Sequence, residues 1–235
     1  MRALIFAAGL GERMRPLTDH TPKPLLEVGG KSLIAWHLER LAALGVRDVV
    51  VNTSWLAAKF PEALGDGAAW GLRLHYSYEG DTPLETGGGM LHALPLLGSE
   101  PFVLVNGDIW TDYNFARLPR EPAGLAHLVM VDRPGHASHG DFALDDGGHV
   151  RADGAQLLTY AGFGVYRPQL LDRWRDMVGS EPGVDRQPPR FRLAPILKAL
   201  MPGGHITGDY HPGRWTDVGT PQRLAELDAQ LRAQA

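Results

Sequence analysis

Cysteine is absent from the 235 residues of the chain. Its absence excludes disulfide bonds, thiolate zinc sites and cysteine nucleophiles. An excess of positive charge is also missing, because the formal net charge is −4 at pH 7. No broad basic surface is therefore available to bind nucleic acid or an anionic membrane, and any anion site must be local.

Long hydrophobic runs are equally absent. No segment approaches the roughly 20 apolar residues of a membrane-spanning helix, and the apolar stretch 3–8 is too short for a signal peptide. Hydrophobic residues nevertheless make up 44% of the chain, which is ordinary for a globular protein. We therefore expect a cytoplasmic monomer or dimer whose partners are small molecules rather than nucleic acid or a membrane.

Short apolar runs alternate with helical patterns over the first 120 residues. The patterns predict strands at 2–7, 48–52, 72–77 and 102–105, and helices at 32–44, 55–64 and 86–97. Such alternation predicts an α/β fold of Rossmann-like type, with a mostly parallel sheet flanked by helices. Ligands of such sheets bind beyond the carboxyl ends of the strands.

The pattern changes after about residue 120. Strands are predicted at 125–131, 142–144, 149–151 and 158–166, with helices at 191–201 and 222–233. Turn signals between these strands make the C-terminal half more antiparallel. We predict a single domain, 1–235, in which the half 121–235 supplies the far wall of a cleft beside the half 1–120.

Two glycines and several cations follow the first predicted strand. Gly9 and Gly11 have no Cβ, so their backbone N–H groups would be able to approach a phosphate closely. Arg13 is suited to fork onto phosphate oxygens. Lys23 stands between two prolines that stiffen the chain around it. The stretch predicts a phosphate-binding loop; the alternative for each cation taken singly is a solvated turn.

This loop matches neither of two common phosphate-binding motifs. A P-loop requires Lys-Ser or Lys-Thr at a fixed spacing, which is missing here. A dinucleotide fingerprint requires a third glycine where Met14 stands, and Pro16 would block its helix. A nicotinamide-dependent oxidoreductase, which would bind NAD and release no pyrophosphate, is therefore a disfavoured alternative.

The segment Gly-Leu-Gly-Glu-Arg-Met-Arg-Pro-Leu-Thr at 9–18, followed by Pro-Lys-Pro-Leu at 22–25, resembles the signature of sugar-1-phosphate nucleotidylyltransferases. Further similarities lie at 85–89, 105–108 and 140–142 and run down nearly the whole chain. The resemblance implies transfer of a nucleotidyl group from a nucleoside triphosphate to a sugar 1-phosphate, with release of pyrophosphate.

Within this family the chain most resembles short uridylyltransferases that act on N-acetylmuramate 1-phosphate in bacterial cell-wall (peptidoglycan) recycling. UTP and the sugar 1-phosphate would then be the substrates, with a nucleotide-binding half, 1–120, and a sugar-binding half, 121–235. The alternatives are a mannose-1-phosphate guanylyltransferase-like enzyme and, more remotely, a non-catalytic sugar-nucleotide sensor. A sensor would be expected to lose Lys23, Asp108 or Asp217, and all three are present.

The resemblance also implies roles for individual residues. Arg13 and Lys23 would be catalytic. The residues expected to contact the nucleotide are Ala8, Gly9, Gly11, Glu85, Thr86, Gly87 and Asn106. Glu85 stands where many relatives have glycine, and the glycines 87–89 have a simple helix entry as their alternative reading. The residues expected to contact the sugar are Asn52, Gly140, Asp141, Tyr160, Gly162 and Arg192, with Arg192 or Lys198 replacing a lysine that the relatives carry in a Glu-Lys-Pro segment.

Two aspartates suit a magnesium ion. Asp108 follows the predicted strand 102–105, and Asp217 lies just before the last predicted helix. Mg²⁺ takes one or two protein carboxylates and completes its coordination with phosphates and water, and the resemblance assigns the family's metal-binding aspartates to these positions. Their alternative reading is a turn residue and a polar lead-in to a helix. His136 and His139 lack further ligands at zinc spacing and are expected to lie in a polar loop.

Overall fold

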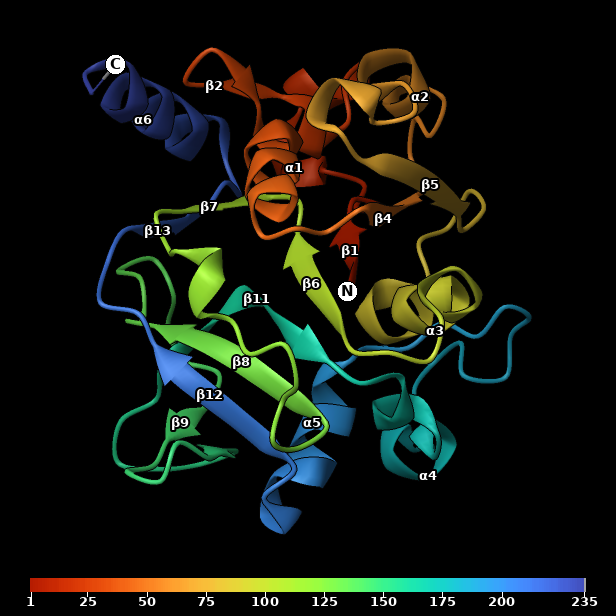
Figure 1. Cartoon of the computed structure of the whole chain (residues 1–235), viewed down its shortest axis with the longest axis vertical. Coiled ribbons are helices and arrows are strands. Elements are labelled where there is room, and N and C mark those ends of the chain that lie inside the picture. Colours follow the sequence, from red (N-terminus) through yellow and green to blue (C-terminus); the bar gives the residue numbers. More distant parts are fainter. Residues whose placement is uncertain (235) are drawn as a thin grey trace.

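A seven-stranded sheet forms the centre of the computed structural model, which describes residues 1–234 (Figure 1). The strand order is β12–β8–β11–β6–β1–β4–β5. The strands are β1 (Arg2–Phe6), β4 (Asp48–Thr53), β5 (Arg73–Tyr78), β6 (Phe102–Asn106), β8 (Ala126–Val131), β11 (Thr159–Tyr166) and β12 (Ile206–Tyr210).

Parallel pairings dominate this sheet. β1 is parallel to β4 and β6, β4 is parallel to β5, and β12 is parallel to β8, whereas β11 runs antiparallel to both β6 and β8. The predicted α/β class, with a more antiparallel second half, is confirmed. The patterns missed β12, an edge strand whose sequence Ile-Thr-Gly-Asp-Tyr is largely polar and only partly buried.

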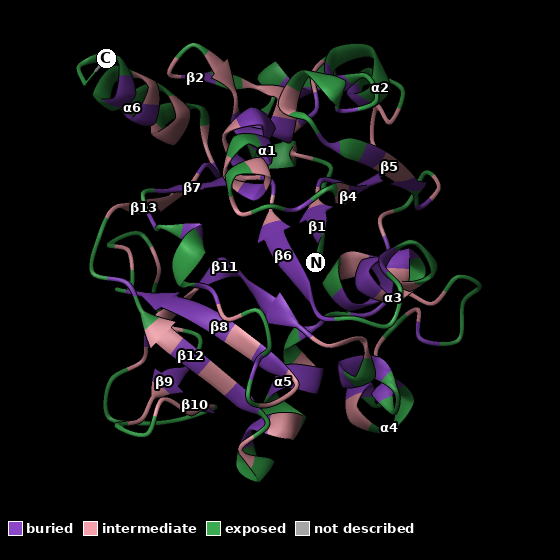
Figure 2. Ribbon diagram, viewed as in Figure 1, coloured by how far each residue is buried: buried purple, intermediate pink, exposed green. Residues whose placement is uncertain are grey.

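The two faces of the sheet are buried by different helices (Figure 2). In β1, Leu4 packs into one core cluster while Ala3 and Ile5 pack into another, as strand alternation requires. The first cluster is completed by α3 (Glu85–Leu97), α4 (Trp174–Val178) and α5 (Ala194–Leu200). The second is completed by α1 (Leu33–Ala43) and α2 (Lys59–Leu64). Each predicted helix of this group is present, and α4 was not predicted.

Helix boundaries follow local chemistry. The last helix, α6 (Pro221–Arg232), begins as predicted, because Thr220 accepts a hydrogen bond from the amide of Arg223 at 3.3 Å and Pro221 fills the first turn. By contrast, α2 begins at Lys59 rather than at residue 55. Leu56 has φ 51°, a left-handed conformation that interrupts any helix at that point.

Three small sheets complete the fold. β2 (Glu27–Val28) pairs with β3 (Lys31–Ser32), and β9 (Ala143–Leu144) pairs with β10 (Val150–Arg151). The third joins β7 (Ile109–Thr111) to β13 (Trp215–Asp217), which are about a hundred residues apart in the sequence. Among residues 1–234, no helix has the length and apolar character needed to cross a membrane.

The start of α3 is clamped by a segment from the C-terminal half. The amides of Gly87 and Gly88 both donate to the carbonyl of Phe191 at 3.0 Å, and the amide of Phe191 donates to the carbonyl of Leu84 at 3.2 Å. A Cβ on Gly88 would lie 2.5 Å from the carbonyl oxygen of Pro189. Gly88 is therefore required by close backbone approach.

We expect Gly88→Ala to lower the free energy of unfolding by about 1–3 kcal/mol, because the added methyl meets a backbone atom that has little freedom to move. Alanine would ordinarily stabilise a helix interior by up to about 1 kcal/mol relative to glycine, so the sign is informative. Urea unfolding measures the change. Gly135→Ala is the control, since a Cβ there has no atom within 4 Å; a Gly88→Ala variant as stable as wild type would contradict the clamp.

Candidate active site

A cavity of about 620 Å³ opens where β1, β4 and β6 end. Its walls include ten of the residues that the sequence predicted for the site, namely Ala8, Gly9, Gly11, Arg13, Lys23, Asn52, Glu85, Thr86, Asn106 and Asp108. They converge because the strands are parallel, so that their carboxyl ends share one edge of the sheet.

The glycines of the opening loop serve different purposes. Gly11 has φ 66°, and a Cβ there would lie 2.8 Å from Cγ2 of Thr18, whose hydroxyl donates to the Gly11 carbonyl at 2.8 Å. Gly11 is thus needed to close the loop. A Cβ on Gly9 would meet nothing within 4 Å, so this backbone borders open space in the cavity. Arg13 is exposed on the turn that follows.

Lys23 forms an ion pair with Asp108. Its ammonium Nζ lies 2.6 Å from Oδ2 of the carboxylate, and only 11% of the lysine side chain is exposed. Lys23 opens a short 3₁₀ turn, Lys23–Leu25, and the prolines on either side of it restrict the backbone. The ion pair with Asp108 orients its side chain. The lysine therefore lies against the cavity wall as a single, oriented positive charge.

Asp108 and Asp217 are brought together by the pairing of β7 with β13. In this register Asp217 lies opposite Ile109, and the amide of Val218 donates to the carbonyl of Asp108 at 2.8 Å. Asp217 forms an ion pair with Arg223, and Nε2 of His136 lies 3.0 Å from its Oδ1.

Both carboxylates retain exposed surface, 39% of the side chain for Asp108 and 26% for Asp217. Asp108 lines the cavity, whereas Asp217 does not, although its backbone lies beside that of Asp108. Exposed carboxylates on paired backbone segments suit Mg²⁺, which needs few protein ligands. Within residues 1–234, no group of three acidic or histidine side chains is placed to hold a metal ion. A bound ion would therefore depend on substrate oxygens as well.

The segment 83–86, at the start of α3, contributes another part of the cavity wall. Glu85 has φ 62°, a left-handed conformation that favours glycine. Its carboxylate pairs with Arg190, which also donates from Nε to the carbonyl of Pro83 at 3.1 Å. Gly87 lies outside the lining of the cavity, its amide being bonded to Phe191.

Asn52 and Glu79 form a buried polar pair at the cavity wall. Nδ2 of Asn52 donates to Oε1 of Glu79 at 2.6 Å, and the two residues are 2% and 5% exposed. Burial raises the pKa of Glu79 to about 7. Asn52, predicted to contact the sugar, thus lies in the same cavity as the residues predicted for the nucleotide.

The remaining residues predicted for the sugar are spread over the C-terminal half. Gly162, with φ 80°, lies at a register shift of β11, where a Cβ would come 2.7 Å from Nδ2 of Asn106. Asp141 accepts a hydrogen bond from the amide of Tyr160 at 2.9 Å, while the hydroxyl of Tyr160 accepts one from Tyr166 at 2.7 Å. Gly162 therefore borders the nucleotide residues, whereas the phenol of Tyr160 is turned toward the core.

A second cavity, of about 540 Å³, opens on this half. Its lining comprises Asp132, Arg133, Ser138, His139, Gly140, Ala155, Gln156 and Leu157. Gly140 is the only residue predicted for the sugar that lines it. Arg192 lines neither cavity and pairs with Glu181 at 2.9 Å. The structure thus distributes the predicted sugar residues over two cavities and their surroundings.

Three charged residues that contact predicted site residues, Glu79, Arg190 and Arg223, were not themselves predicted. Glu79 comes just after a predicted strand, as Asn106 does, so its position at a strand end was an available signal. Arg190 lies in an irregular loop, and Arg223 looks like an ordinary charged residue of a surface helix. Neither arginine has a local pattern that marks it as part of a site.

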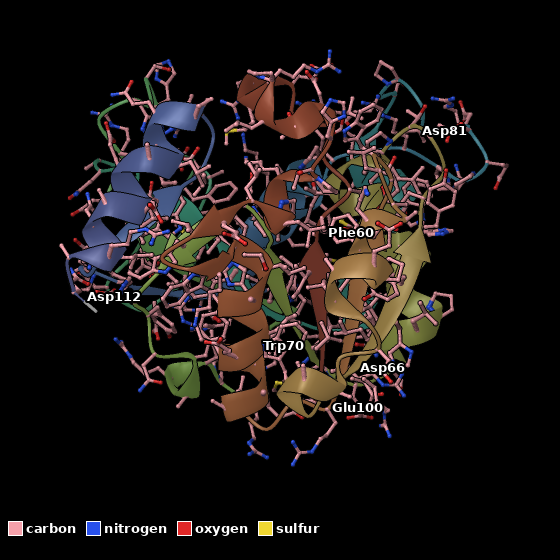
Figure 3. All side chains as sticks on the ribbon, turned by 90° about the horizontal axis from the view of Figure 1, so that it is seen from above. Phe60, Asp66, Trp70, Asp81, Glu100 and Asp112 are labelled. Carbon is pink, nitrogen blue, oxygen red and sulfur yellow. The ribbon has the colours of Figure 1, made fainter. Side chains whose placement is uncertain are left out.

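Figure 3 shows the molecule of Figure 1 turned so that it is seen from above. Asp81, beside the cavity-lining Thr82, and Asp112, which directly follows β7, lie on opposite sides of the molecule in this view.

The profile of the nucleotidyl transferase family matches residues 2–151. The chain belongs to this family. It is 46% identical over 236 residues to N-acetylmuramate alpha-1-phosphate uridylyltransferase from Neisseria meningitidis serogroup B, with 97% of each chain covered. It is 35% identical to the protein of the same name from Caulobacter vibrioides, over 97% of this chain and 96% of the other. The predicted resemblance to sugar-1-phosphate nucleotidylyltransferases is confirmed.

More distant relatives agree with this placement. The chain is 30% identical to mannose-1-phosphate guanylyltransferase from Mycobacterium tuberculosis, over 97% of this chain and 64% of that protein. Among solved structures, a Bacillus anthracis protein assigned as a glucose-1-phosphate thymidylyltransferase superposes with a TM-score of 0.84 over 99% of this chain and 95% of the other, at 19% identity. This last likeness concerns the fold alone.

The raised pKa of Glu79 predicts a pH-dependent stability. An acid whose pKa is higher in the folded than in the unfolded chain stabilises the fold below its unfolded value, and this contribution is lost as the pH rises through the folded value. Between about pH 5 and 8, Glu79 should therefore lower the free energy of unfolding by up to about 3 kcal/mol. Urea unfolding of wild type and Glu79→Gln over this range measures it. A difference between the two proteins that stays constant with pH would contradict the assignment.

Proposed function

We propose that the protein transfers a uridylyl group from UTP to N-acetylmuramate 1-phosphate, giving UDP-N-acetylmuramate and pyrophosphate, and that it acts in peptidoglycan recycling. Two relatives with this activity in their names match it over almost their whole length. The observation that carries the proposal is the meeting of Arg13, Lys23 and Asp108 around one cavity, with Asp217 paired beside it.

The proposed reaction requires no general base. A phosphate monoester has a second pKa of about 6 and is already mostly ionised at neutral pH. One of its oxygens attacks the α-phosphorus of UTP, a new P–O bond forms, and the bond to pyrophosphate breaks on the opposite side. The main obstacle is electrostatic, since two anions must approach one another and the leaving group carries charge.

The chain's own cations address this obstacle. Exposed at the mouth of the loop, Arg13 is assigned to the departing phosphates, where its fork matches phosphate oxygens. Lys23, fixed between its prolines, is assigned to the α-phosphate and the incoming phosphate. Catalysis then consists of positioning together with electrostatic stabilisation.

Asp108 and Asp217 would hold Mg²⁺, because they are partly exposed carboxylates on backbone segments that lie side by side. When bound, the ion would neutralise charge on the triphosphate. The segment 83–86 and Asn106 are assigned to the base and ribose, and Gly162, which borders Asn106, to the sugar. The proposed setting is the cytoplasm.

The second candidate is a mannose-1-phosphate guanylyltransferase, favoured by the relative from Mycobacterium tuberculosis. It would use the same loop and the same aspartates, so those residues do not distinguish the two candidate functions. The base and the sugar separate them.

A grid of nucleoside triphosphates and sugar 1-phosphates tests the assignment. With Mg²⁺ present, we expect pyrophosphate release to be fastest for UTP with N-acetylmuramate 1-phosphate. A GTP and mannose 1-phosphate pair that reacts faster would replace the first candidate by the second. Release in no combination would refute the proposed reaction class.

Removal of either proposed catalytic cation should slow turnover strongly without unfolding the chain. We expect Arg13→Ala and Lys23→Ala each to lower kcat by about 100-fold or more, as loss of one transition-state contact does. Arg15→Ala is a matched control, because this arginine lies in the same loop, pairs with Asp19 at 3.4 Å and does not line the cavity. Near-normal rates for the first two variants would remove these residues from the mechanism.

A further inference from the structure

A buried chain of hydrogen bonds connects the two segments that line the cavity. The amide of Ala7, where the opening loop begins, donates to Oδ1 of Asn52 at 2.6 Å. Nδ2 of Asn52 donates to Oε1 of Glu79 at 2.6 Å, and Oε2 of Glu79 accepts from the amide of Leu84 at 2.8 Å. The chain thus runs from the end of β1 to the residue that precedes α3.

Burying this chain of hydrogen bonds costs free energy, and the surrounding residues accommodate it. Taking a carboxyl group out of water costs free energy unless its oxygens are hydrogen-bonded, and both oxygens of Glu79 are. Gly89 leaves the necessary room, since a Cβ there would collide with Oε1 of Glu79 and lie 2.8 Å from Nδ2 of Asn52. Apolar side chains at positions 52 and 79 would fill the same space without burying a polar group.

The two ends of the chain of bonds are the starting points of functional segments. Ala7 leads directly into Ala8 and Gly9, and Leu84 leads directly into Glu85 and the start of α3, all of which line or border the cavity. A nucleotide that contacts both segments needs their separation to be fixed before it binds.

We propose that Asn52 and Glu79 are positioning residues for the nucleoside triphosphate, holding the opening loop and the segment 83–86 at the spacing that the nucleotide requires. The inference rests on the proposed function for the identity of the ligand. It assigns neither residue a contact with the reacting atoms.

The pattern of donors and acceptors suggests a sharp test. Both ends are backbone N–H donors, so the link requires an acceptor at each end and one donor between them. An amide at position 52 and a carboxylate at position 79 meet this need. The reverse arrangement, Asn52→Asp together with Glu79→Gln, meets it equally well and changes almost no volume.

Each single substitution breaks the pattern. Asn52→Asp sets two carboxyl groups against each other, and Glu79→Gln leaves an amide N–H₂ group facing either another donor or the amide of Leu84. We expect each single variant to raise the dissociation constant and the KM for UTP roughly tenfold or more, with the KM for the sugar 1-phosphate much less affected. The double variant should return to within about threefold of wild type.

The test compares wild type, the two single variants and the double variant. It measures UTP binding by titration calorimetry, steady-state kinetics and the melting temperature of each protein. Thr207→Val is the control: it removes a partly buried hydrogen bond to His127 of 3.0 Å at the far edge of the sheet, and should lower stability without altering UTP binding. Single variants that melt early yet bind UTP as wild type does would show a purely structural role. A double variant no better than the singles would also overturn the inference.

The proposed function fails differently. If wild type prefers another nucleoside triphosphate, the same comparison is made with that compound. The positioning role is then tested by whether the double variant restores its binding. A wild-type chain that binds no nucleoside triphosphate would overturn the reaction and the positioning role together.

Discussion

The pairing of β7 with β13 is the contact on which the site depends. It places Asp217 opposite Ile109 and bonds Val218 to the backbone of Asp108, so that one carboxylate from each half of the chain reaches the same edge of the sheet. The net charge of −4 provides no general attraction for anions. A phosphate would therefore be held by a few oriented groups, with Lys23 and Arg223 already lying against the two aspartates.

Much of the fold was predictable because buried strands carry continuous apolar runs. β1, β4 and β6 were recognised in this way, and polar residues at or just after their carboxyl ends, such as Asn52 and Asp108, line the cavity. The strands that were missed, β2, β3, β7, β12 and β13, are short or lie at an edge, so the sequence pattern marks them weakly. The late start of α2 follows from the backbone of Leu56, which the helical pattern did not reveal.

The site was less completely predictable, for a physical reason. Motif residues are close in sequence, so their spacing reflects their geometry. Arg190, by contrast, reaches the cavity from an irregular loop that hydrogen-bonds to the start of α3, far earlier in the sequence. The sugar side shows the same limit. Gly140 and Arg192 were grouped by resemblance, yet the structure places one in the second cavity and the other beside Glu181.

The hydrogen bonds from Gly87 and Gly88 to Phe191 tie the front portion of the chain to the C-terminal half. The family profile ends at residue 151, whereas the carbonyl that receives the amides of Gly87 and Gly88 belongs to Phe191, far beyond it. A fragment cut at the end of the profile would expose these amides and would lose Asp217 as well. The portion 2–151 is thus no independent module, and an enzyme made by joining it to a foreign C-terminal half would need a replacement for the backbone carbonyl of Phe191.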